Sequence, residues 1–276
     1  VLRLARPPLR RGDRMTASRW DDLTPRLISG ALMVGIGMLG VWLGGLWFHG
    51  LVVIISAIMV WELVGMLDAA RSKAPLVLAL IAGACLAVAI EVPISFALPL
   101  LLFPSMAGFG RMEQGGVRYA VFTASIMLAG YGMMALRDDF GLVWMAWLVS
   151  VVVVTDIAGY FAGRTIGGPK FWPRVSPKKT WAGTVAGWVG AALVGLGFAA
   201  ATTAGSGLMG ISIAVAMASQ IGDIAESAVK RKAEVKDSSN LIPGHGGLLD
   251  RFDGMLGAAL FILFVGQLVG LPTATP

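Results

Sequence analysis

The chain has 276 residues, of which 57% are hydrophobic and only 14% carry a charge, with a net charge of +6. Since about one quarter of the residues in a soluble domain are charged, this composition excludes an ordinary soluble protein. The apolar residues form blocks of roughly 20, the length of a helix that crosses a bilayer, so we expect an all-α, polytopic integral membrane protein. In such a protein a basic excess indicates cytoplasmic loops, and we expect no nucleic acid as a partner.

The chain begins with a basic arm, residues 1–26, which lacks the apolar region of a signal peptide. Nine apolar spans are predicted after it. Their expected limits are 27–48, 51–67, 75–90, 93–110, 117–136, 141–163, 181–204, 208–229 and 252–271. We therefore divide the chain into the arm, N-terminal transmembrane helices over 27–136, and a C-terminal transmembrane region over 137–276 that holds the candidate catalytic residues.

The basic residues test this topology. With the N-terminus in the cytoplasm, 21 of the 22 Lys and Arg residues lie on the cytoplasmic side, and Arg137 is the exception. The expected cytoplasmic segments are 1–26, 68–74, 111–116 with Arg118 beside it, 164–180 and 230–251. Because cytoplasmic loops carry the excess of Lys and Arg, this split supports nine spans and a C-terminus on the outer side.

Acidic residues fall near the inner ends of three spans. They are Asp156, Asp223, Glu226, Asp250 and Asp253. Ionisable residues at membrane depth are costly, so they are candidates for function. The helical period places Asp223, Ser227 and Lys230 on one face. Carboxylates gathered in a basic surround suit Mg²⁺ bound to phosphate. The alternative is that they pair with Lys and Arg and hold helices together, which is a stronger alternative for one acid alone than for the whole set. For Glu62, in the second span, an interhelical hydrogen bond and a role in the site are both open.

Two cytoplasmic segments could bind phosphate. Residues 176–180 read SPKKT and precede a predicted helix, whose N-terminal N–H groups and positive dipole end attract anions. Residues 243–247 read PGHGG, and glycines let the backbone approach an anion closely. The alternatives are a basic membrane anchor for the first segment and a plain turn for the second.

From Ser227 to Asp253 the sequence reads SAVKRKAEVKDSSNLIPGHGGLLDRFD. This segment closely resembles the signature of the phosphatidate cytidylyltransferases, the CDP-diacylglycerol synthases. Further similar positions upstream are Asp156, Tyr160, Gly163, Arg164, Ser176, Pro177, Lys179, Thr180, Gly222 and Asp223. The resemblance extends by motif over residues 150–255, with small departures at Gly159 and Ala182.

The resemblance implies a membrane enzyme, homodimeric, in the bacterial inner membrane with its active site facing the cytoplasm. Such an enzyme condenses CTP with phosphatidic acid to give CDP-diacylglycerol and pyrophosphate, with Mg²⁺, Mn²⁺ or a second cation as cofactor. Its expected metal ligands are Asp223 and Asp250, supported by Asp253 and Asp156. The expected catalytic residues are Asp223, Asp250, Lys230, Arg251 and His245. The expected substrate-binding residues are Ser176, Lys179, Thr180, Ser227, Arg231, Lys236, Asp237, Gly246 and Gly247.

Two other functions are open. A CTP-dependent enzyme that acts on another lipid, such as a polyprenol kinase or an ether-lipid cytidylyltransferase, would share the CTP and metal dependence. An ion-coupled transporter would place its carboxylates near the middle of the bilayer. Here the carboxylates lie at the inner ends of helices, which favours the enzyme.

Overall fold

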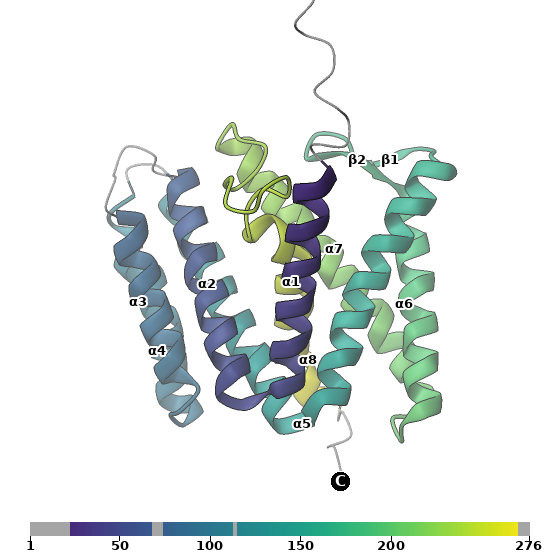
Figure 1. The fold of residues 1–276 in the computed structure, drawn as a ribbon, viewed down its shortest axis with the longest axis horizontal. Helices are drawn as coiled ribbons and strands as arrows, with labels where there is room; N and C mark the ends of the chain where they lie inside the picture. Colours follow the sequence, from purple (N-terminus) through teal and green to yellow (C-terminus); the bar gives the residue numbers. More distant parts are fainter. Residues whose placement is uncertain (1–22, 68–73, 113–114, 270–276) are drawn as a thin grey trace, which may run out of the picture.

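The computed structural model describes residues 23–67, 74–112 and 115–269, which form eight α-helices and one β-hairpin. The predicted all-α class is confirmed, whereas most of the basic arm lies outside the described residues. The elements are α1 (Leu23–Leu43), α2 (Gly45–Leu67), α3 (Ala74–Ala89), α4 (Ile94–Phe109), α5 (Gly116–Thr165), β1 (Lys170–Trp172), β2 (Ser176–Thr180), α6 (Trp181–Ala201), α7 (Leu208–Lys232) and α8 (Leu249–Val269). The helices lie side by side with their ends at two common edges (Figure 1).

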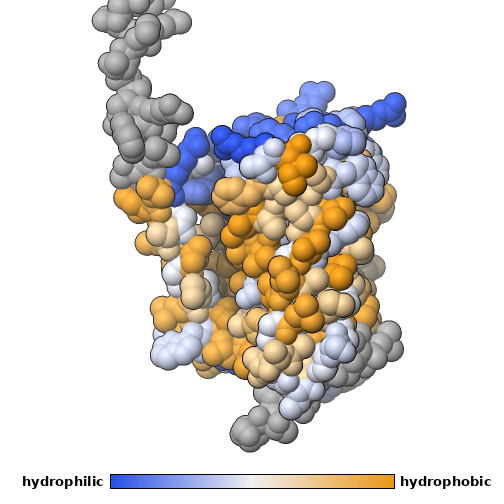
Figure 2. Space-filling view, turned by 90° about the vertical axis from the view of Figure 1, so that its right-hand side faces the viewer, coloured by the Kyte–Doolittle hydropathy of each residue, from blue (hydrophilic) through white to orange (hydrophobic). Residues whose placement is uncertain are grey.

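The lengths of most helices and the hydrophobic side of the bundle (Figure 2) are those expected of a protein that crosses a bilayer. Within the described residues, five helical segments are long and apolar enough to cross a membrane, namely Pro25–Leu43, α2, α5, α6 and α7. Helices α3 and α4 have 16 residues each, or about 24 Å, and are shorter than the hydrocarbon core of about 30 Å. Hydrophilic residues gather along one edge, and hydrophobic residues cover the side below it (Figure 2). The chain is therefore an integral membrane protein.

The prediction of nine separate helices is not confirmed, because the described residues form eight. The fifth and sixth predicted spans are joined in α5, and residues 137–140, expected as an outer loop, are helical. Gly141 interrupts this helix with φ 84° and ψ −172°, a conformation that glycine adopts without steric cost. The chain reverses there, at the lower edge of Figure 1. A turn made by one glycine replaces the loop that the polar residues suggested.

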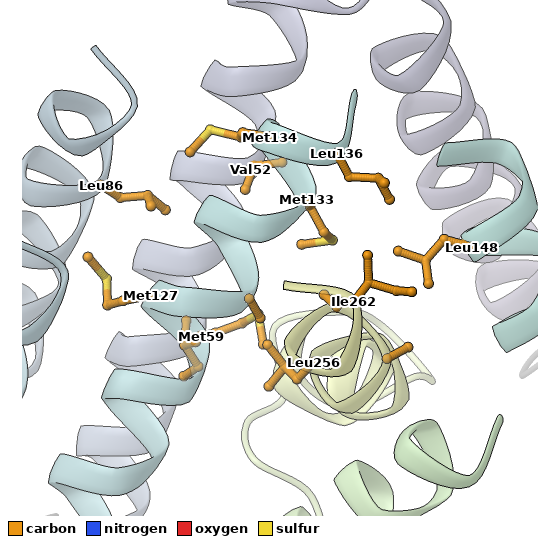
Figure 3. Packing of buried hydrophobic residues seen from close by; sticks show 14 of the residues in the cluster. Val52, Met59, Leu86, Met127, Met133, Met134, Leu136, Leu148, Leu256 and Ile262 are labelled. Atoms are coloured by element: carbon orange, nitrogen blue, oxygen red, sulfur yellow. The ribbon is translucent and has the colours of Figure 1, made fainter. Parts of the chain in front are cut away.

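The core lies where α5 meets α2 and α8. Met133 and Leu136 of α5 point toward Ile262 of α8, while Met127 lies near Met59 of α2 (Figure 3). In a bilayer the hydrophobic effect does not drive helices together, so association depends on close packing. The core residues supply this packing for the centre of the bundle.

Glycines bring the helices of the C-terminal half into backbone contact. A Cβ atom on Gly257 of α8 would collide with the carbonyl oxygen of Ala218 on α7, and one on Gly222 would collide with that of Asp253. Between α5 and α6, a Cβ on Gly183 would lie 2.6 Å from the carbonyl oxygen of Gly159. These contacts hold α7 close to α8, and α5 close to α6, near the edge of the bundle where the predicted site residues lie.

Candidate active site

A cavity of about 400 Å³ opens between the second half of α5, strand β2, the start of α6 and α7. It lies at the polar edge of the bundle. Five charged residues line it, which are Asp156, Arg164, Lys178, Lys179 and Asp223. Three cations and two carboxylates give the lining a net positive charge, which favours an anionic ligand.

Lys179 and Asp223 are paired across the cavity. Lys179 Nζ lies 2.6 Å from Asp223 Oδ2, and the two side chains are only 24% and 31% exposed. The other oxygen of Asp223 accepts a hydrogen bond of 3.3 Å from Ser227 Oγ, one helical turn further along α7. The sequence places Lys179 in the predicted cytoplasmic segment 164–180 and Asp223 in a span, and the structure brings these two predicted site residues together.

The hairpin leads directly into α6. Thr180 is its last residue and the N-cap of α6, and its buried hydroxyl oxygen accepts a hydrogen bond of 3.2 Å from Gly183 N–H. The Thr180 hydroxyl therefore serves the helix start, while Lys178 and Lys179 face the cavity. Ser176 begins β2, pairs with Trp172 and is not among the residues that line the cavity.

A second cluster is formed by the segment 233–248, which joins α7 to α8, together with the adjoining ends of these two helices. Lys230 Nζ lies 2.6 Å from Asp250 Oδ1 and 2.5 Å from Glu226 Oε2. Asp250 Oδ2 accepts hydrogen bonds of 2.8, 2.9 and 2.8 Å from Ser238 N–H, Ser238 Oγ and Gly247 N–H. Both carboxylate oxygens of Asp250 are thus engaged by this segment and by Lys230.

Asp250 precedes Phe252, where the predicted apolar span begins, so it lies at the polar edge of α8. Burial raises the pKa of Asp250, but the hydrogen bonds from Lys230, Gly247 and Ser238 and the charge of Lys230 outweigh it. The pKa is therefore below its ordinary value, and the carboxylate is ionised at neutral pH.

The glycine-rich turn folds back on its own segment. Gly244 and Gly246 have φ values of 74° and 83°, and Ile242 N–H donates to Gly246 O at 2.8 Å. Arg251 Nε donates to His245 O at 2.9 Å, and His245 Nδ1 lies 2.9 Å from Ser29 Oγ of α1. These contacts hold the glycine-rich turn against the start of α8 and place His245 against α1.

The predicted site residues thus separate into two groups at one edge. Asp156, Lys179, Thr180 and Asp223 line the cavity, with Ser227 behind Asp223. Lys230, Asp250, His245, Gly246, Gly247 and Arg251 belong to the second cluster. Arg231, Lys236 and Asp237 are exposed, and Asp253 is half-buried with its Oδ1 accepting from Gly254 N–H at 2.7 Å.

Nine residues that line the cavity were absent from the predicted site, and those with the largest polar side chains are Tyr160, Arg164, Lys178 and Gln220. Tyr160 and Arg164 are joined by a hydrogen bond of 2.7 Å from Arg164 Nη1 to the tyrosine oxygen. Gln220 accepts from Trp188 Nε1 at 2.9 Å and donates to Thr184 O at 3.2 Å. A glutamine inside an apolar span, one turn before Asp223, is the signal that could have identified it.

The cavity fits Mg²⁺ only in combination with a phosphate ligand. In residues 23–67, 74–112 and 115–269, no three His, Cys, Asp or Glu side chains form a group that could hold a metal ion. Asp156 and Asp223 nevertheless line one cavity. Mg²⁺ is typically bound by one or two carboxylates plus substrate phosphates, and these two carboxylates match that donor set.

Several curated proteins that are similar to this chain have the same name. A segment of 156 residues is 42% identical to the phosphatidate cytidylyltransferase of Brucella suis biovar 1 and covers 54% of this chain and 58% of that protein. The proteins with that name from Bacillus subtilis and Helicobacter pylori are 39% identical over 131 and 132 residues. These two segments cover 46% and 47% of this chain and 49% of each relative. The chain thus matches about half the length of these relatives.

A family model covers nearly all of the described structure. The model of the cytidylyltransferase family matches residues 24–269, from the start of α1 to the end of α8. This range includes both the cavity and the second cluster. The chain belongs to the cytidylyltransferase family.

Proposed function

We propose that this chain is a phosphatidate cytidylyltransferase, which converts CTP and phosphatidic acid into CDP-diacylglycerol and pyrophosphate. The observation that carries the proposal is the cavity with three cations and two carboxylates at the polar edge of an apolar helix bundle. A triphosphate needs the cations, and a lipid acceptor needs the adjoining apolar surface. The relatives named phosphatidate cytidylyltransferase support the same choice.

In the proposed reaction a phosphate oxygen of phosphatidic acid attacks the α-phosphorus of CTP. A new P–O bond forms, the bond between the α-phosphorus and the bridging oxygen to the β-phosphate breaks, and pyrophosphate leaves with the electron pair. Such a displacement requires alignment and charge neutralisation more than covalent assistance. Lys178, Lys179 and Arg164 line the cavity and would hold the phosphates there.

We also propose that Asp156 and Asp223 hold Mg²⁺ together with the substrate phosphates, with Mn²⁺ as a substitute. A bound cation would neutralise charge on the attacking and leaving groups. Asp250 and Asp253 stay predicted ligands, but Asp250 already accepts four hydrogen bonds in the second cluster. The cavity residues therefore take the leading place in this proposal.

The membrane arrangement that accords with this function has nine crossings, with the two halves of α5 counted separately at Gly141. The cavity would face the cytoplasm of a bacterial inner membrane, where CTP is present, and the enzyme would be a homodimer. The edge that carries the cavity also carries the loops predicted to be cytoplasmic by their Lys and Arg content. A tag placed after Val269 that is labelled from the cytoplasmic side would contradict the nine crossings.

Labelled CTP separates the candidate reactions. The purified protein is incubated with vesicles containing phosphatidic acid, Mg²⁺ and CTP labelled at either the α- or the γ-phosphate. A cytidylyltransferase moves the α-label into lipid and releases the γ-label in pyrophosphate. A lipid kinase moves the γ-label into lipid, and an acceptor other than phosphatidic acid gives no product until that lipid is added. Absence of α-labelled lipid with phosphatidic acid would contradict the proposed function.

A further inference from the structure

A buried carboxylate on α2 binds the segment that joins α7 to α8. Glu62 is 1% exposed and accepts four hydrogen bonds. Ser239 Oγ and Leu248 N–H donate to Oε1 at 2.7 and 2.9 Å, and Ser238 Oγ and Leu249 N–H donate to Oε2 at 3.2 and 2.7 Å. These donors lie 176 to 187 residues further along the chain.

Two of these donors are backbone N–H groups at the start of α8. The first N–H groups of a helix have no partner inside the helix, and the positive end of the helix dipole lies there. Glu62 satisfies two of them and places its negative charge at that end. A buried carboxylate is costly unless it is fully hydrogen-bonded, so this complete set of donors accounts for an ionisable residue inside α2.

The same segment also binds Asp250. Ser238 Oγ lies 2.9 Å from Asp250 Oδ2 and 3.2 Å from Glu62 Oε2, so one serine lies between the two carboxylates. A Cβ atom on Gly247 would collide with Ser238 Oγ and lie 2.5 Å from Glu62 Oε1. Only glycine fits there, and its N–H donates to Asp250. The positions of Ser238, Gly247 and Asp250 are therefore set together with that of Glu62.

We propose that Glu62 is a positioning residue for nucleotidyl transfer. It fixes Ser238, Ser239 and the first turn of α8 against α2, and through them it fixes Asp250 and its partner Lys230 at the edge of the active site. The effect on transfer rests on the proposed function, whereas the attachment of the segment to α2 does not. In the proposed function the substrates occupy the cavity between α5, α6 and α7, which Glu62 does not line.

Glu62→Gln tests this role because it keeps the size of the side chain. Each oxygen of Glu62 accepts from one backbone N–H group. In either orientation of the amide, its NH₂ group therefore faces a backbone donor, and that hydrogen bond is lost. Packing of α2 through Met59 and Leu63 stays, so the change releases the segment without opening the core.

The experiment measures both the segment and the reaction in the full-length protein. Trypsin cleavage after the exposed Lys236 reports release of the segment. We expect roughly 10- to 100-fold faster cleavage there in Glu62→Gln, and a fall in kcat of similar size with little change in the KM for CTP. Ser239→Ala, which removes one of the four donors, should give a smaller change in the same direction. Glu91→Gln, at an exposed position in the turn between α3 and α4, is the matched control and should change neither rate.

Unchanged cleavage and unchanged kcat in Glu62→Gln would overturn the proposal. Faster cleavage at every tryptic site, with a lower melting temperature, would also overturn it, because it would show a role in general stability. If Glu62→Gln does not fold, Ser239→Ala decides by the same two rates. A wild-type protein without cytidylyl transfer would contradict the proposed function, and the cleavage rates would still show whether Glu62 holds the segment.

Discussion

Replacement of Asp223 by asparagine is expected to abolish activity and leave the fold intact. The amide keeps the shape of the side chain but removes the charge that faces Lys179 at 2.6 Å. An ion pair of this partly exposed kind stabilises a protein by about 0–1 kcal/mol, so the loss of stability should be small. The effect on activity should be large, because we propose that Asp223 helps to neutralise the substrate phosphates through a cation. We expect kcat/KM to fall by at least about 100-fold, which is a loss of about 2.7 kcal/mol of transition-state stabilisation.

The assay is transfer of α-labelled CTP into lipid, with thermal unfolding in detergent measured in parallel. Asp138→Asn is the matched control, because Asp138 Oδ2 lies 2.8 Å from His49 Nε2 near the turn at Gly141, at the opposite edge. It should retain wild-type turnover. Turnover of Asp223→Asn within about threefold of wild type would refute the reasoning. Full activity in the double variant Asp223→Asn with Lys179→Met would also refute it, because it would show that the two residues serve only as an ion pair.

Three further changes test the site and the packing that supports it. Lys179→Ala should raise the KM for CTP about 10- to 100-fold, because a charge-assisted phosphate contact is lost. The control Lys232→Ala, at an exposed position, should leave this KM unchanged. An unchanged KM in Lys179→Ala would remove Lys179 from the site. Excess chelator should abolish transfer and added Mg²⁺ or Mn²⁺ should restore it, so full activity in chelator would exclude a metal requirement. Gly257→Val should lower the free energy of unfolding by about 1–3 kcal/mol, and with it the melting temperature, because its Cβ would meet Ala218 O. Gly210→Val, at a position with open space around it, should leave the melting temperature unchanged. Equal effects of the two changes would contradict the close packing of α7 and α8.

The helical class could be predicted from the sequence because it depends on local patterns, and the same patterns place candidate site residues near one end of the helices. Long apolar blocks define helices in a bilayer, and Asp156 and Asp223 are conspicuous as charges inside such blocks. The chain reversal between the fifth and sixth spans was predicted, but it was placed on residues 137–140, because the charged residues Arg137, Asp138 and Asp139 are typical of a loop. The structure keeps these residues helical and reverses the chain at Gly141. Its effect depends on a positive φ that only the structure shows.

The division of the site into two clusters could not be predicted, because it depends on contacts between residues far apart in the chain. The signature from Ser227 to Asp253 is continuous in sequence, yet Ser227 contacts Asp223 beside the cavity while Asp250 turns toward Ser238 and Lys230. Glu62 had two open roles because its partners lie at least 176 residues away. Spacing along one helix indicates which residues share a face, but it does not indicate what that face meets.

The central claim is that CTP binds in the cavity between α5, α6 and α7, and photo-crosslinking tests it most directly. A photoreactive CTP analogue is attached to the purified protein in vesicles, with and without excess CTP, and the labelled peptides are identified. The account predicts labelling within residues 155–184 or 220–227 that excess CTP suppresses. Labelling confined to residues 233–248, or labelling that excess CTP does not suppress, would contradict it.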